Sequence, residues 1–111
     1  MHNFERELME LGIIDSDLQS IHIDEWFENA KLSYIGVSQQ IIYVEFLNCF
    51  EISFKHDKTY SKDKNKNGEL NYKYFVQNIE IDNEEDFWKI TIDAWPLEAK
   101  IVCRDIEIHH G

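Results

Sequence analysis

Hydrophobic positions follow two different periods along the chain, and the first is helical. Near the N-terminus, apolar residues recur at i, i+4 and i+7, as they do on one face of a helix: Phe4, Leu8 and Leu11. Asn3 can cap the start of this helix and Gly12 can end it. We therefore predict a helix over residues 3–11. A second short helix is predicted within residues 15–30, with Trp26 and Phe27 as its apolar anchors.

From Leu32 onward the period changes to two, and β-branched and aromatic residues dominate, which is typical of strands. Six segments carry this pattern: 32–38, 40–47, 50–56, 70–81, 87–95 and 99–108. Because the gaps between them are short, consecutive strands should pair as antiparallel neighbours. The pattern predicts an α+β fold, in which an antiparallel meander of about six strands carries one or two N-terminal helices. A sheet curled into a partial barrel is the alternative architecture.

Composition favours a single globular domain. The chain has 111 residues, of which 43% are hydrophobic and 14% aromatic, enough apolar area for a buried core. With one proline and four glycines, the sequence contains no Pro- or Gly-rich linker that would divide the domain. We predict one domain over 1–111, with a helical part at 1–30, a sheet at 31–108 and a mobile lysine-rich hairpin loop at 57–69.

Splitting the strands by parity separates a core face from a mixed face. The uniformly apolar phase holds the predicted core: Ile35, Val37, Ile42, Val44, Phe46, Phe50, Ile52, Phe54, Trp88, Ile90, Ile92 and Ala94. The other phase combines aromatic and acidic residues, which together suit a protein interface. Six residues of this phase are predicted to bind a partner: Tyr34, Tyr43, Glu45, Glu51, Asp93 and Trp95. Two alternatives stay open: aromatic packing on a solvated sheet, or a face that lines the interior of a curled sheet.

The charge balance narrows the choice of partner. The formal net charge is −11, and it is more negative still outside segment 55–73, where six lysines outnumber three acidic residues. Such a surface repels nucleic-acid phosphates and anionic membranes, and it attracts a basic protein. Acidity that serves only solubility is the alternative.

Carboxylates stand beside large aromatic residues twice in the sequence. Asp24, Glu25 and Glu28 surround Trp26–Phe27, and four acidic residues lie within 82–86, just before Phe87–Trp88. They are either solvated charges at loops and helix ends or a surface that neutralises a cationic site.

No catalytic, metal-binding or cofactor-binding residues are predicted. Residues 63–71 resemble an EF-hand loop, but Tyr74 replaces the bidentate Glu, so an Asn67–Gly68 hairpin is the better interpretation. The histidines lack ligand spacing, and Cys49 and Cys103 are interpreted as reduced, buried thiols. Neither a long apolar run nor a signal-peptide pattern is recognisable, so we expect a cytoplasmic protein.

Three segments carry a resemblance to known proteins: WFENAKL at 26–32, FWKITIDAW at 87–95 and KIVCRDIEI at 100–108. With the N-terminal helix, they resemble small acidic α+β proteins of bacteria, a group that includes immunity proteins of polymorphic-toxin and contact-dependent inhibition systems. The resemblance implies a non-enzymatic protein that binds and blocks a cognate toxin, usually encoded beside it. The alternatives are a homo-oligomeric structural protein and a small-molecule-binding domain with a sheet-lined pocket.

Overall fold

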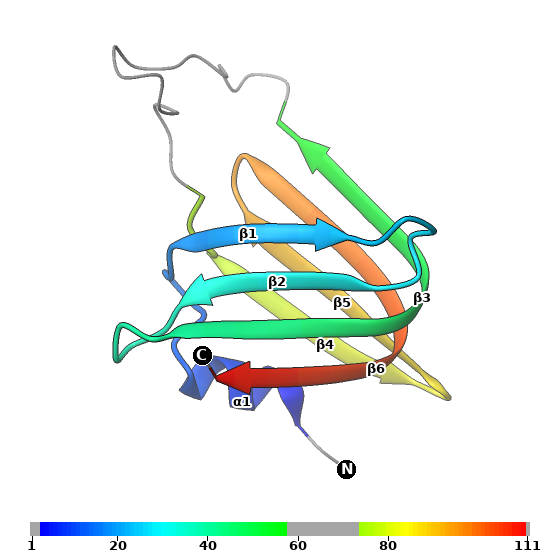
Figure 1. The fold of residues 1–111 in the computed structure, drawn as a ribbon, viewed down its shortest axis with the longest axis horizontal. Helices are drawn as coiled ribbons and strands as arrows, with labels where there is room; N and C mark the ends of the chain where they lie inside the picture. Colours follow the sequence, from blue (N-terminus) through cyan, green and yellow to red (C-terminus); the bar gives the residue numbers. More distant parts are fainter. Residues whose placement is uncertain (1–2, 58–73, 111) are drawn as a thin grey trace.

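The computed structural model describes residues 3–57 and 74–110, which form one short helix and six strands (Figure 1). Their bounds are α1 Phe4–Glu10, β1 Leu18–Ile23, β2 Ala30–Ile35, β3 Ile41–His56, β4 Asn78–Glu84, β5 Phe87–Ala94 and β6 Leu97–His110. The predicted hairpin loop at 57–69 and the EF-hand-like stretch lie almost entirely outside the described residues, as does the first part of the predicted strand 70–81.

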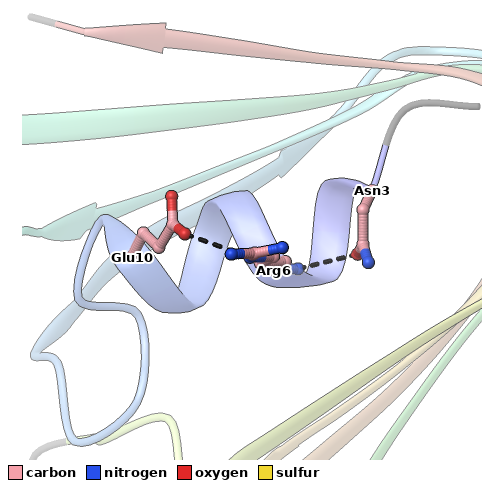
Figure 2. A network of polar contacts seen from close by, with 3 residues as sticks. All are labelled: Asn3, Arg6 and Glu10. Atoms are coloured by element: carbon pink, nitrogen blue, oxygen red, sulfur yellow. Dashed lines mark hydrogen bonds and ion pairs between the residues drawn. The ribbon is translucent and has the colours of Figure 1, made fainter.

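Helix α1 confirms the prediction made from its capping residues. The side chain of Asn3 accepts a hydrogen bond of 2.9 Å from the backbone N–H of Arg6, and Arg6 Nε lies 3.2 Å from Glu10 Oε1 (Figure 2). At the other end, the N–H of Ile13 donates to Leu8 O and the N–H of Gly12 donates to Met9 O. These are the two hydrogen bonds of a Schellman motif. Leu8 and Ile13 are both fully buried, which supplies the hydrophobic contact of that motif.

The predicted second helix within residues 15–30 is wrong, and in the described part of the predicted helical region 1–30 the only α-helix is Phe4–Glu10. Leu18–Ile23 instead forms strand β1, which pairs with β2. Ile21 and Ile23 alternate with polar neighbours, and β-branched residues at this spacing pack well in a strand. Residues 24–29 form the turn between β1 and β2, and they carry Trp26 and Phe27.

All six strands form one antiparallel sheet in the order β1-β2-β3-β6-β5-β4. Four consecutive pairs are neighbours: β2–β3, β4–β5 and β5–β6 as predicted, and β1–β2, which was not predicted. Strand β3 pairs with β6 rather than with β4, so the sheet is two three-stranded meanders joined by β3 and β6. Edge strands β1 and β4 do not close a barrel. The chain just before each of them meets in a single bridge, Asp17 to Phe75, flanked by hydrogen bonds from Leu18 N to Tyr74 O and from Val76 N to Ser16 O.

Strands β3 and β6 are long because each crosses a bend. The predicted strands 40–47 and 50–56 are one strand, and the predicted turn at Asn48 is the place where it bends. Asn48 has φ +56°, and Phe50 is an extra residue in the register between Cys49↔Cys103 and Glu51↔Val102, which makes a β-bulge. Beyond the bend the sheet folds back over itself, so that β4, β5 and the first half of β6 lie behind β1 and β2 (Figure 1).

The core fills the space between the two halves of this bent sheet. Buried residues come from both halves and from the N-terminal segment: Leu8, Ile13, Ala30, Leu32, Tyr34, Ile42, Val44, Phe46, Val76, Ile79, Ile90, Ile92, Ala94, Ala99, Ile101, Cys103 and Ile106. Val37 and Phe50 were expected in the core but are 75% and 61% exposed. Val37 lies beyond the end of β2, and the bulge turns Phe50 outward.

Candidate partner-binding site

Tyr34 does not belong to a partner-facing surface, and its predicted placement there is wrong. Its side chain is 0% exposed, its hydroxyl donates to Leu11 O at 3.4 Å, and burial raises the pKa of the phenol to about 12. Directly opposite residues of an antiparallel pair share a face, and Tyr34 lies opposite the buried Ile42. The core phase of β2 is therefore Ala30, Leu32 and Tyr34.

Tyr43 and Glu45 lie on the outward side of β3, where β2 and β6 flank them. We call this group the outer strip: Lys31, Tyr43, Glu45, Glu107 and His109. The ammonium of Lys31 lies 4.6 Å from the centre of the Tyr43 ring. His109 Nε2 lies 3.4 Å from Glu45 Oε1 and 3.5 Å from Glu107 Oε1. The aromatic ring and both carboxylates of this strip thus already have cationic or ionisable neighbours within the chain.

Asp93 and Trp95 lie at the other end of the long strands, in a groove of about 520 Å³. The groove is lined by the end of β3, the start of β4 and the β5–β6 connection: Lys55, His56, Asp57, Gln77, Asn78, Asp93, Trp95, Pro96, Leu97 and Glu98. The indole N–H of Trp95 donates to Asp57 Oδ2 at 2.8 Å. Asp93 lies opposite Glu98 on β6 and Asn78 on β4, so its neighbours are polar.

Glu51 stands apart from both places, on the bend beside the bulged Phe50. Tyr43 lies near the start of β3, before the bend, and Trp95 bonds to Asp57, which follows the end of β3 beyond the bend. The structure therefore distributes the five outward residues over three regions instead of gathering them into one site.

A third region, the bent end, holds exposed aromatic side chains that were not among the predicted partner-binding residues. Trp26 and Phe27 in the β1–β2 turn are 79% and 65% exposed, and Phe50 on the bulge is 61% exposed. The ring of Phe50 meets the ring of Phe87 edge-on at 5.1 Å, and the Arg104 guanidinium lies 5.4 Å and 5.7 Å from these two rings. The signal in the sequence was the repeated placement of carboxylates beside aromatics at 24–28 and 82–88.

Hydrogen bonds fasten the β1–β2 turn to the bulge. Glu28 O accepts from Cys49 N at 2.7 Å, and Asn29 Oδ1 accepts from Asn48 N at 3.2 Å. Within the turn, Asp24 accepts from Glu28 N at 2.8 Å and from Asn29 Nδ2 at 2.7 Å. The hydrogen bond from the Asn29 amide is the main cause that lowers the pKa of the Asp24 carboxyl. The turn is thus a defined structure that joins β3 at the bend.

The described residues show little that would support catalysis or metal binding. No three His, Cys, Asp or Glu side chains among them are placed to hold a metal ion. Burial raises the pKa of the Cys49 thiol to about 11 and that of Cys103 to about 12, which disfavours the nucleophilic thiolate. Within 3–57 and 74–110, no helix has the length and apolar character needed to span a bilayer.

Comparisons with known proteins give both a fold relative and a family. A crystal structure of an uncharacterised protein from Neisseria gonorrhoeae superposes with a TM-score of 0.66 at 16% sequence identity, over 86% of this chain and 91% of that one. At this identity, the match shows a shared fold. The search of curated proteins gave no significant match. The sequence model of the family Immunity protein PIM7 matches residues 1–110, nearly the whole chain, and this chain therefore belongs to that immunity protein family.

Proposed function

We propose that this protein binds a cognate toxin with a basic surface and neutralises it by occupying that surface. Membership of an immunity protein family implies a toxin partner, and the formal net charge of −11 supports a cationic one. The family match over residues 1–110 is the observation that carries the proposal. The protein acts in the cytoplasm as a stoichiometric binder, not as an enzyme.

Binding proceeds in two physical stages. The negative field first attracts the basic toxin and speeds the encounter, an effect that salt weakens because ions screen exposed charges. Aromatic side chains are then buried against the toxin and slow dissociation, because removing large apolar rings from water stabilises the complex. The acidic surface thus sets the association rate, and the rings set the lifetime.

The test uses the toxin polypeptide encoded beside this gene, produced as a purified domain. We expect a complex of one protein with one toxin by calorimetry, and restored growth when both are expressed in the same cells. Raising NaCl from 50 to 500 mM should lower the association rate constant at least about tenfold and change the dissociation rate much less. A toxin that is neither bound nor inhibited would overturn the proposal. An association rate that is indifferent to salt would overturn its electrostatic part.

A further inference from the structure

We infer that the toxin docks on the bent end, with its arginine and lysine side chains against the aromatic rings there. This inference rests on the proposed function and adds the surface and the chemistry of the contact. The bent end comprises the β1–β2 turn, the bulge of β3, the bend of β6, and the β4–β5 turn with the start of β5, all at the right-hand side of the view in Figure 1.

The first argument is the exposure of large aromatic side chains. Trp26, Phe27 and Phe50 are 79%, 65% and 61% exposed, so most of each ring faces water instead of the core. Tryptophan is among the residues most enriched where binding energy concentrates in protein interfaces. Several exposed rings at one end of a small domain mark an interaction surface.

The second argument is that these rings lie on connected segments. Glu28 of the turn bonds to Cys49, Cys49 lies opposite Cys103, and Cys103 lies opposite Trp88. The four segments are therefore adjacent across the bend, in the order turn, β3, β6 and β5. Neighbouring strands are about 4.8 Å apart, so the whole row spans roughly 15 Å, well within the width of one protein interface.

Charge complementarity commits the surface to a cationic partner. The segments 24–29, 48–51, 84–88 and 103–105 contain eight carboxylates and a single cation, Arg104. All eight acidic residues are exposed: Asp24, Glu25, Glu28, Glu51, Glu84, Glu85, Asp86 and Asp105. A basic protein would bring the opposite charges to this end.

Arg104 shows how the rings receive a cation. Its guanidinium lies within 6 Å of the centres of both Phe50 and Phe87, the range of a cation–π contact. An arginine from the toxin can use the exposed rings of Trp26 and Phe27 in the same way, with nearby carboxylates as hydrogen-bond acceptors.

Local rigidity favours the bent end further. The turn is held by the hydrogen bonds of Asp24 and joined to β3 through Glu28 and Asn29, so little conformational entropy remains to be lost on binding. In the outer strip, by contrast, Tyr43 already carries Lys31 on its ring, and His109 lies beside Glu45. The toxin would have to displace these contacts there. At the bent end the same holds for Phe50 and Phe87, which carry Arg104, so the exposed rings of Trp26 and Phe27 are the ones that a toxin side chain meets first.

Matched variants separate the surfaces, with the purified toxin domain as the probe. Trp26→Ala should weaken binding about tenfold or more, mainly through faster dissociation. Glu85→Lys should lower the association rate several-fold. Glu80→Lys, at an exposed position on β4, makes the same change in net charge away from the bent end and should lower that rate less. Unchanged circular dichroism and melting temperature would establish that each variant folds.

Variants of the outer strip supply the decisive comparison. If Tyr43→Ala and Glu45→Lys weaken the complex while Trp26→Ala and Glu85→Lys bind as the wild type does, the bent-end assignment is overturned and the proposed function stands. If Glu85→Lys and Glu80→Lys lower the association rate by the same factor, the net charge rather than this surface governs association. A wild-type protein that fails to bind the toxin would remove the proposed function and the inference together.

Discussion

Gly12 ends α1 in a conformation that glycine adopts without strain. Its φ is +77°, and a Cβ added there would overlap Val37 Cγ1. We expect Gly12→Ala to lower the free energy of unfolding by about 1–2 kcal/mol, the cost of a left-handed conformation for an L-residue. Urea denaturation measures this change. In the double variant Gly12→Ala with Val37→Ala, the overlap with Val37 Cγ1 is removed. Only the cost of the left-handed backbone conformation should then remain. A Gly12→Ala variant as stable as the wild type would contradict the assignment.

The two cysteines face each other across β3 and β6, and both have a raised pKa, about 11 for Cys49 and about 12 for Cys103. Since the thiolate is the reactive form, both thiols should react slowly with Ellman's reagent at pH 8. We expect a rate at least about tenfold lower in the native protein than in guanidinium chloride, after allowance for the higher nucleophilicity of a high-pKa thiolate. Equal rates in the two conditions would show that burial does not protect them.

At the scale of single elements, local signals were sufficient for α1 and misleading for β2. The helix was predictable because its caps, Asn3 and Gly12, act within a few residues. Parity in β2 favoured Ile35 and Val37 over Tyr34, because their phase is uniformly apolar and the other phase is mixed. Pairing with β3 decides the question, since the buried Ile42 lies opposite Tyr34. Tyr34 was therefore wrongly included among the predicted partner-binding residues.

The bend in β3 depends on Asn48, whose φ of +56° is tolerated by asparagine and by glycine. Asn48→Gly should therefore leave the free energy of unfolding within about 0.5 kcal/mol of the wild type. Asn48→Val should reduce it by about 1–2 kcal/mol, because a β-branched residue is strained there. The side chain is exposed, so loss of packing does not confuse the comparison. Chemical denaturation of both variants tests it, and equal stability would contradict a bend built on this residue.

For the whole molecule, the sequence predicted the class of fold and the immunity protein type more fully than the arrangement of surfaces. Strand pairing between β3 and β6 joins residues far apart in the chain, and local patterns carry no information on it. That pairing is what brings the carboxylates and aromatics at 24–28 next to those at 84–87. Each cluster was recognisable in the sequence, but their meeting at one end was not.

The acidic excess predicts two effects of salt with opposite signs. Like charges repel within the folded chain, so screening by NaCl should stabilise it, while the same screening should weaken attraction to the proposed basic toxin. Between 20 and 300 mM NaCl we expect the melting temperature to rise by roughly 4 °C, the shift that about 1 kcal/mol produces in a domain of this size. Glu80→Lys, which brings the net charge to −9 from the formal −11, should show a smaller rise. A melting temperature that falls with NaCl would mean that attractive ion pairs outweigh the repulsion, and the acidity would then serve the fold rather than the encounter.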